Sequence, residues 1–396
     1  MAKQNKPAIR FKEFTDAWEQ RKAKDLCSIS TGKSNTQDRV DDGIYPFYVR
    51  SPIVEHSNRY LFDEEAVLTV GDGVGTGKVF HYVNGKYDLH QRVYRMFDFS
   101  EEITAKYFYY YFSNHFYDRV MAMTAKTSVD SVRYEMIADM DIALPKVKEQ
   151  MAISAYFDRL DHLITLHQRK YDKLQVLKKA MLEKMFPKNS SGVPEIRFKG
   201  FTDAWEQRKL GDMMNVTSVK RIHQSDWTDC GIRFLRARDI VSAYKNEEPG
   251  DYLYISKEKY DEYSSISGKV STGDMLVTGV GTIGVPYLVE NSDPLYFKDG
   301  NIIWFQNEDK VFGKFLFYSF TGKSIQDFIT ESAGIGTVGT YTIESGKKTP
   351  IALPDKEEQE RIGLFFANLD NLITLHQREL EKLQNIKKSM LEKMFV

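Results

Sequence analysis

The sequence lacks the features of a secreted or membrane protein. It has only two cysteines in 396 residues, Cys27 and Cys230, at places that are not equivalent, so we expect reduced, partly buried thiols and no disulfide. No run of about 18 apolar residues is present to span a bilayer. The start of the chain has no apolar core of a secretory signal and predicts a short flexible tail over residues 1–8. We therefore expect a cytoplasmic protein without a membrane partner.

The chain also has almost no excess charge. Its formal net charge is −1, with 28% charged and 42% hydrophobic residues, as in ordinary soluble globular proteins. This balance neither favours nor excludes a nucleic-acid partner, because a DNA-binding protein needs a local basic surface and not a basic total.

Established catalytic motifs are missing as well. The sequence contains no GxSxG, no HExxH, no CxxC and no Asn-Pro-Pro-aromatic motif of an amino-methyltransferase. We therefore expect a non-catalytic chain that has no catalytic residues, binds no metal and holds no cofactor of its own.

Two glycine clusters are the nearest approach to a catalytic motif. GDGVGTGKV, from Gly71, resembles a phosphate-binding loop, but Asp72 stands where that loop needs its first glycine and Val79 where it needs Ser or Thr. GVGTIG at 279–284 satisfies GxGxxG, but Pro286 interrupts the helix that should follow. We interpret both clusters as turns that bring the backbone close to a ligand. Our alignment places Gly73 and Gly75 on Gly279 and Gly281.

What the chain does contain is a tandem duplication. IRFKEFTDAWEQRK at Ile9 returns as IRFKGFTDAWEQRK at Ile196, 187 positions later (196 − 9). LITLHQRKYDKLQVLKKAMLEKMF at Leu163 returns at Leu372, 209 positions later (372 − 163), identical at 18 of 24 positions. The period is too long for a solenoid, whose repeats run about 20 to 50 residues. A nearly constant frame around divergent segments predicts one scaffold that presents two different readers.

Each copy ends in a predicted long helix that begins after a proline, Pro145 or Pro354. Apolar residues then recur at alternating steps of four and three, which is the spacing of a coiled-coil seam. The seam positions are Ile153, Phe157, Leu160, Ile164, His167, Tyr171, Leu174, Lys178, Met181 and Met185, and Ile362, Phe366, Leu369, Ile373, His376, Leu380, Leu383, Lys387, Met390 and Met394.

Four seam residues are polar. His167 and His376 are interpreted as register-setting residues, because no Cys, Asp or second His stands three or four residues on to complete a metal site. Lys178 and Lys387 are expected to extend from the seam edge into solvent. Leucines beside the seam widen the apolar stripe enough for a further partner to pack there: Leu163, Leu166 and Leu177.

The two helices could pair in either direction, and we expect an antiparallel coiled coil that relates the halves by a pseudo-two-fold axis. The expected organisation is a tail (1–8), a first recognition domain (9–146), a first long helix (147–186), a linker (187–195), a second recognition domain (196–354) and a second long helix (355–396).

The divergent segments read as α+β, with several strands and helices packed to one side. Strand-like stretches begin at Ile44, Ala66, Lys78 and Arg92 in copy one, and at Ile232 (IRFLRARDIV), Met275, Val285 and Asn301 in copy two. An aromatic-rich helical stretch follows from Lys106 and from Lys314.

Basic residues recur at matching places in these segments. Aligning Asp42-Gly43-Ile44 with Cys230-Gly231-Ile232 puts Arg50 on Arg238. Each residue alone could be solvated surface charge, but arginine, lysine and asparagine beside strand ends and glycine turns are the side chains that read base edges and hold phosphates. The candidate DNA-binding residues are Lys33, Arg39, Arg50, Lys78, Arg92 and Arg95, and Lys220, Arg221, Arg233, Arg236, Arg238, Thr282, Lys298 and Asn301.

These features together resemble the specificity subunit of a type I restriction-modification system. The paired FTDAWEQRK motifs, the paired IALP helix starts, the paired LITLHQR helices and the divergent middles carry the resemblance, which covers nearly the whole chain. It implies that each middle is a target recognition domain reading one half of a bipartite, asymmetric site in double-stranded DNA. The antiparallel helices would set the gap between the half-sites.

The resemblance also implies partners. Two modification subunits would carry S-adenosylmethionine chemistry, and two restriction subunits would carry ATP- and Mg²⁺-dependent translocation and cleavage. Frame aromatics would form docking surfaces for the modification subunits, with ordinary core packing as the alternative: Phe14, Trp18, Phe201 and Trp205.

Two other functions stay open from the residues alone. A self-contained DNA-binding regulator would bind its site without partners. A small-ligand or nucleotide-binding enzyme would use the glycine loops.

Overall fold

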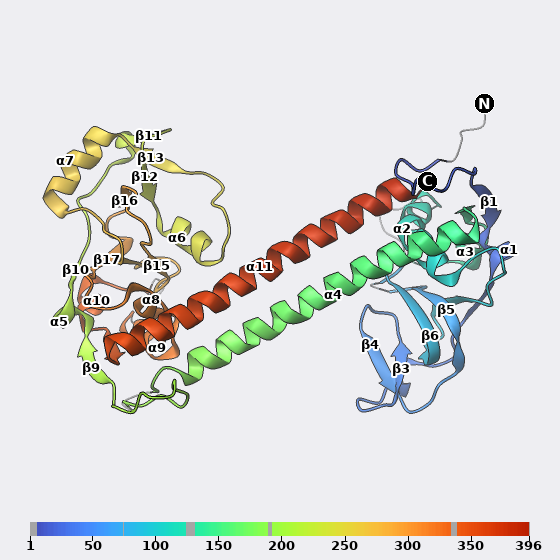
Figure 1. The fold of residues 1–396 in the computed structure, drawn as a ribbon, viewed down its shortest axis with the longest axis horizontal. Helices are drawn as coiled ribbons and strands as arrows, with labels where there is room; N and C mark the ends of the chain where they lie inside the picture. Colours follow the sequence, from blue (N-terminus) through green and yellow to red (C-terminus); the bar gives the residue numbers. More distant parts are fainter. Residues whose placement is uncertain (1–5, 74, 124–130, 189–191, 334–338, 396) are drawn as a thin grey trace. The chain divides into compact units, whose positions relative to one another are not determined.

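The computed structural model describes residues 6–73, 75–123, 131–188, 192–333 and 339–395. The chain divides into unit 1, residues 1–168 with 378–396, and unit 2, residues 169–377. Each unit takes in part of both long helices, α4 (Val147–Lys184) and α11 (Lys356–Met394) (Figure 1). The expected tail and linker lie partly outside the described residues.

The repeated motifs of each copy pair with each other. β1 (Glu19–Lys22), from FTDAWEQRK, runs antiparallel to β8 (Asp141–Leu144), the strand that leads into α4. In unit 2, β9 (Glu206–Lys209) pairs in the same way with β18 (Pro350–Leu353), which leads into α11. The two ends of each copy thus form one structure, the strand pair with the start of the long helix, which we call the frame. This shared structure accounts for the repeated sequence at both ends.

A buried ion pair closes each frame. The Arg10 guanidinium donates to both carboxylate oxygens of Glu149, at 2.6 and 2.7 Å. Arg197 and Glu358 repeat this geometry with both distances at 2.7 Å. The two glutamates are buried and stand in the first turn of their long helices. The sequence pattern did not pair these glutamates with the arginines of the repeated N-terminal motif.

The long helices pair antiparallel, as expected. In unit 1 the Ile9 amide donates to the Lys393 carbonyl at 2.9 Å, so the end of α11 lies in the frame that holds the start of α4. In unit 2 the Ile196 amide donates to the Lys184 carbonyl at 2.9 Å, so the end of α4 lies in the frame that holds the start of α11.

The seam follows the heptad pattern, and none of its positions is exposed. Phe157 stacks on Phe395 in unit 1, with ring centroids 5.7 Å apart. Phe366 stacks on Phe186 at 5.9 Å in unit 2. The same contact thus closes the core where the helices meet each frame.

The seam lysines are partly exposed, at 24% and 26% of their side chains, and form ion pairs that the sequence did not predict. Lys178 forms an ion pair with Asp370 at 2.6 Å, and Lys387 forms one with Asp161. These partners are equivalent in the duplication, because each aspartate stands on the helix facing the lysine. A tyrosine hydroxyl donates to the same aspartates, from Tyr110 to Asp161 at 2.9 Å and from Tyr318 to Asp370 at 2.7 Å.

Unit 1 contains a six-stranded sheet in the order β2-β7-β5-β6-β3-β4. Helix α2 (Ala105–Met123) packs on β5 and β6, and its buried aromatic side chains form the core with the seam of α4. The other elements are α1 (Ala23–Leu26), β2 (Ser28–Thr31), η1 (Thr36–Asp38), β3 (Tyr45–Tyr48), β4 (Val54–Ser57), β5 (Phe62–Val70), β6 (Phe80–Leu89), β7 (Val93–Phe97) and α3 (Tyr134–Ala138).

Unit 2 contains two four-stranded sheets, β10-β17-β14-β15 and β11-β13-β12-β16. Its elements are α5 (Leu210–Met213), β10 (Asn215–Thr217), η2 (Gln224–Asp226), β11 (Trp227–Thr228), β12 (Ile232–Leu235), α6 (Ala237–Tyr244), β13 (Leu253–Ile255), α7 (Lys257–Ser267), β14 (Met275–Thr278), β15 (Pro286–Leu288), β16 (Leu295–Phe297), β17 (Ile302–Gln306), α8 (Gly313–Thr321), α9 (Lys323–Ser332) and α10 (Ile343–Lys348). The α+β prediction is confirmed.

Two local predictions need correction. IRFLRARDIV is a strand only to Leu235, because Asp239 accepts the Arg236 amide at 2.8 Å and caps the new helix α6. The helical stretch from Lys314 is two helices, α8 and α9, that meet at Gly322.

Both cysteines are free, Cys27 buried and Cys230 exposed. Burial raises the pKa of the Cys27 thiol to about 12, which leaves it unreactive. The expectation that Cys230 is partly buried was wrong, because Cys230 is exposed. Among the described residues, no helix has both the length and the apolar composition to cross a bilayer.

The Glu149→Ala substitution should destabilise unit 1 by about 3 kcal/mol, because it leaves the largely buried Arg10 guanidinium without its counter-charge. Chemical denaturation would measure the loss. Glu19→Ala, which removes an exposed partner of Arg21, should cost less than about 1 kcal/mol. Equal losses in the two variants would contradict the role assigned to the buried pair.

Candidate nucleic-acid interface

Some of the candidate residues cluster where parallel strands end. In unit 1, β3 runs parallel to β6 with Tyr48 opposite Leu89. In unit 2, β12 runs parallel to β16 with Leu235 opposite Phe297. Beyond each pair the chain turns into the next strand, through residues 90–92 in unit 1 and 298–301 in unit 2. We call these two segments the strand-end turns.

A glycine packs against each strand-end turn. The Gly71 amide donates to the Arg92 carbonyl at 2.8 Å, and the Gly279 amide donates to the Asn301 carbonyl at 2.7 Å. A Cβ atom on Gly71 would lie 2.7 Å from the Arg92 carbonyl oxygen. Only glycine allows this approach.

These contacts correct our alignment of the two loops by two residues. Gly71 and Gly279 make equivalent hydrogen bonds, and Gly73 and Gly281 both have positive φ, of +89° and +78°. The structural match is therefore Gly73 with Gly281. Gly75 has no glycine counterpart, and a Cβ there would lie 2.8 Å from the Val79 side chain. The alignment by glycine spacing was wrong because the two loops differ in length after their matched glycines, Gly73 and Gly281.

In unit 1 the structure brings three basic candidates to one place. The Lys33 amide donates to the Leu89 carbonyl at 3.1 Å, beside the strand-end turn. Arg50 and Arg92 both approach Asp72, at 3.5 and 3.7 Å, next to Gly73. Lys33, Arg50 and Arg92 are exposed, so this cluster can meet a ligand.

The other candidates of unit 1 lie elsewhere. Arg39 forms ion pairs with Asp41 at 2.6 Å and Glu55 at 3.3 Å. The Lys78 ammonium lies 4.7 Å from the centre of the Tyr117 ring, beside α2.

Arg95 is held inside unit 1 and has no free face for a base edge. It donates to Ser30 Oγ at 2.8 Å and pairs with Glu64, and its side chain is 12% exposed. The rings of Phe62 and Phe97 cover its guanidinium at 3.8 and 3.6 Å. Arg95 lies within β7, and its side chain packs against side chains of the sheet. The sequence did not show this, because it does not give the spatial neighbours of a single charged residue.

Unit 2 has a corresponding cluster around its strand-end turn. Lys298 and Asn301 belong to the turn, and Arg221 reaches it through an ion pair with Asp299 at 3.6 Å. Thr282 is exposed and follows Gly281 in the adjacent loop. Arg238 stands just beyond β12, is 60% exposed and pairs with Asp251.

Three other candidates of unit 2 are occupied by internal contacts. Arg236 bonds Asp239 at 2.8 Å and Asp251 at 2.9 Å with a side chain 14% exposed, and its hydrogen bond to Asp239 is the first cause that raises its pKa. The Arg233 guanidinium lies 3.9 Å from the Tyr252 ring centre. The Lys220 ammonium lies 4.4 Å from the Tyr263 ring centre.

Sequence reasoning missed two polar residues of the unit 1 cluster, Arg59 and Gln91. Arg59 pairs with Asp38 at 2.9 Å and donates to Ser34 Oγ, beside Lys33. Gln91 lies in the strand-end turn and donates its side-chain amide to Asn35. Gln91 could have been found from the sequence, because it stands next to Arg92 and because Asn and Gln are the usual partners of adenine.

The frame aromatics divide into two kinds. Trp18 and Trp205 are buried core residues, and the Trp205 indole donates to Glu358 at 3.2 Å, so these two serve packing and offer no docking surface. Phe14 and Phe201 are half-buried at the surface of the frame, and the Arg361 guanidinium lies 5.2 Å from the Phe201 ring centre.

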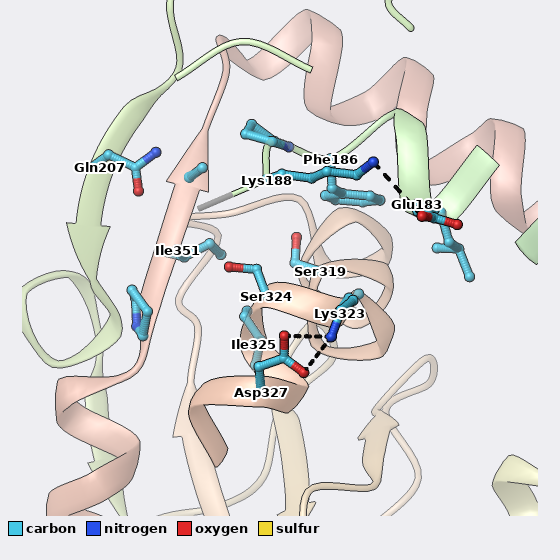
Figure 2. A pocket seen from close by; sticks show the side chains of 15 residues that line it. Glu183, Phe186, Lys188, Gln207, Ser319, Lys323, Ser324, Ile325, Asp327 and Ile351 are labelled. Carbon is cyan, nitrogen blue, oxygen red and sulfur yellow. Dashed lines mark hydrogen bonds and ion pairs between the residues drawn. The ribbon is translucent and has the colours of Figure 1, made fainter. Parts of the chain in front are cut away.

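No candidate DNA-binding residue lines a cavity of about 320 Å³ in unit 2, within the described ranges of the chain. Figure 2 shows Lys323 pointing to Asp327, and Lys188 to Glu183, at its rim. Residues of the two glycine loops are also absent from the lining of this cavity, within the part of the chain that the structure describes. No group of three His, Cys, Asp or Glu residues among the described residues is placed to hold a metal ion.

The fold and the clusters define a class: a duplicated α+β frame that presents a different set of arginine, lysine and amide side chains on each copy. Comparison with known proteins gives the family. The family model described as the type I restriction modification DNA specificity domain matches residues 15–176 and again 202–385. The chain therefore belongs to this family and carries two copies of its domain. Membership assigns it to DNA sequence recognition as a type I restriction-modification specificity subunit.

Curated relatives match along most of the chain. The MjaVIII specificity subunit of Methanocaldococcus jannaschii is 23% identical, over 94% of this chain and 91% of the relative. The EcoDI specificity subunit of Escherichia coli is also 23% identical, over 96% of this chain and 88% of the relative. A crystal structure of a type I S subunit from M. genitalium shares the fold, with a TM-score of 0.68, 13% identity and 99% of each chain covered.

The placement of Arg95 and Arg92 predicts that removal of Arg95 lowers stability, whereas removal of Arg92 lowers DNA binding. Arg95→Ala should lower the free energy of unfolding by about 2 kcal/mol, because it removes buried packing and a hydrogen bond. Arg92→Ala should change stability by less than about 0.5 kcal/mol, since its side chain is 65% exposed, and should weaken DNA binding. Denaturation and DNA titration of both variants check this, and the reverse pattern would refute the assignment of the two arginines.

Proposed function

We propose that unit 1 and unit 2 each read one half of a bipartite, asymmetric site in double-stranded DNA, and that the two long helices set the length of the spacer. The observation that carries this proposal is the difference between the two clusters. One frame occurs twice, but the strand-end turns carry Gln91 and Arg92 in unit 1 and Lys298 and Asn301 in unit 2. Different side chains at one position in the fold make the two half-sites different.

The helices support a spacer role. They contain 38 and 39 residues, which at about 1.5 Å per residue is roughly 60 Å. A helix of this length suits half-sites one to two turns of DNA apart, at about 34 to 36 Å per turn. The buried seam and the two equivalent Lys–Asp pairs keep the helices in one register.

We further propose that this chain docks two modification subunits and, for cleavage, two restriction subunits in the cytoplasm. Leucines that the seam does not cover support docking, since they are exposed at equivalent positions of both helices: Leu163, Leu166, Leu372 and Leu375. The partners would supply S-adenosylmethionine, ATP and Mg²⁺ chemistry, and no residue of this chain is assigned to those cofactors. This chain would contribute recognition and geometry, and no catalytic step.

The proposal is tested by mapping adenine methylation with single-molecule sequencing in cells that express this chain with a type I modification subunit. We expect one methylated motif made of two short blocks separated by a fixed number of unspecified bases. If the subunits assemble and no such motif appears, the chain is a self-contained regulator or a ligand-binding protein.

Substitution of single arginines should separate the half-sites. Arg50→Ala should relax or abolish recognition of one block, and Arg238→Ala that of the other, each by roughly 5- to 150-fold, as expected for one base-reading arginine. Methylation maps of the two variants give the result. The equivalent frame residues Arg21 and Arg208 are matched controls, whose alanine variants should leave both blocks intact. Loss of the same block in both Arg50→Ala and Arg238→Ala would refute the assignment of the two arginines to different half-sites.

A further inference from the structure

In each unit, one aspartate lies between two arginines of the candidate interface. In unit 1, Asp72 approaches Arg50 Nη1 at 3.5 Å with one carboxylate oxygen and Arg92 Nε at 3.7 Å with the other. In unit 2, Asp251 accepts from Arg236 Nη1 at 2.9 Å with one oxygen and from Arg238 with the other. The two aspartates are not equivalent in the duplication, so the same arrangement is built in two ways.

The sheet register places the unit 1 group. Val70 stands opposite Val93 in the β5–β7 pair, so the next position brings Gly71 against Arg92. The backbone of residue 72 is then held by a bridge to Ser131. Arg50 arrives from the end of β3, the neighbour of β6. The carboxylate is thus carried by a fixed backbone and not by a free loop.

A different register places the unit 2 group. Phe234 stands opposite Leu253 in the antiparallel β12–β13 pair, and continuing that register by two positions brings Arg236 opposite Asp251. Arg236 also donates to the Asp251 backbone carbonyl at 2.7 Å. Arg238 joins from the first turn of α6. Hydrogen bonding by Arg236 is the first cause that lowers the pKa of Asp251, so this carboxylate is charged at neutral pH.

Folding stability does not account for the ion pairs of Arg50, Arg92 and Arg238, because ion pairs at exposed positions contribute little. A carboxylate on a DNA-facing surface also repels phosphates and weakens non-specific binding. What it can provide is orientation, since a guanidinium held by a carboxylate presents its remaining donors in a fixed direction. Bidentate recognition of guanine needs that direction, whereas phosphate binding tolerates many.

We propose that Asp72 and Asp251 are positioning residues that determine specificity: Asp72 orients Arg50 and Arg92, and Asp251, itself held by the internal Arg236, orients Arg238, towards base edges and away from the phosphate backbone. This inference rests on the proposed function of the two units. It assigns no base to either arginine pair.

The test compares Asp72→Asn and Asp251→Asn in the assembled complex with modification subunits. Asparagine keeps the shape of the side chain and removes its charge. We expect Asp72→Asn to blur the block that Arg50→Ala affects, and Asp251→Asn to blur the block that Arg238→Ala affects. We also expect tighter binding to an unrelated duplex, so that the ratio of specific to non-specific affinity falls roughly 10-fold or more.

Salt dependence distinguishes orientation from simple loss of structure. An arginine freed onto a phosphate should steepen the slope of log affinity against log salt by about one for unrelated DNA. A variant that merely unfolds its unit would bind all DNA more weakly. Asp72→Glu, which restores the charge, should recover most of the specificity ratio. The control variants Glu101→Gln in unit 1 and Asp212→Asn in unit 2 remove exposed carboxylates outside the clusters and should change neither the motif nor the slope.

Each outcome has one meaning. If the wild-type complex methylates a bipartite motif but both asparagine variants keep that motif and its specificity ratio, the positioning role is overturned. Weaker binding of Asp72→Asn to specific and unrelated DNA alike, without rescue by glutamate, also overturns it in favour of a structural role. If the wild-type complex itself yields no bipartite motif, the failure lies with the proposed function.

Discussion

The rest of the structure depends on the buried ion pair between the repeated N-terminal motif and the start of a long helix. Arg10 with Glu149, and Arg197 with Glu358, connect a segment at one end of each copy to a helix at the other end. Removal of either member would leave a largely buried charge unpaired, which costs about 3 to 5 kcal/mol. The two frames therefore keep nearly identical sequences. The segments between the paired strands are free to diverge, because their side chains do not enter this contact.

Divergence is also limited by backbone packing. Gly71 and Gly279 hold each loop against its strand-end turn. A Cβ atom would collide with the Arg92 carbonyl oxygen at Gly71 and with the Tyr341 carbonyl oxygen at Gly279. The two units keep this approach and the positive φ of Gly73 and Gly281 while the neighbouring side chains change. A recognition surface built in this way can exchange Arg92 for Asn301 without rebuilding the strands behind it. Under the proposed function, a shared backbone with different side chains would give one fold two specificities.

The arginines illustrate how one residue type can be held in internal contacts or remain available to a ligand. Arg95 and Arg236 have side chains 12% and 14% exposed and bind carboxylates within their own unit. Arg50 and Arg238 are 49% and 60% exposed and retain donors for a ligand. The division follows from what surrounds each side chain. Arg95 lies within β7 and meets neighbouring strands, and Arg236 follows β12 but is held by Asp239 and Asp251. Arg50 and Arg238 lie beyond strand ends and meet solvent. Equal charge in the sequence does not imply equal availability to DNA.

The sequence by itself determined the duplication, the α+β class, the ten-position seams and the family, because repeats and hydrophobic periodicity are local properties of the chain. It also placed Arg50 and Arg92 of unit 1, and Asn301 of unit 2, beside strand ends. It did not determine the partners of Lys178, Arg95 or Glu149, which lie far away in the sequence. Only the tertiary structure decided these contacts, and with them the true equivalence of the glycine loops, because strand register and helix packing select the neighbours of each side chain.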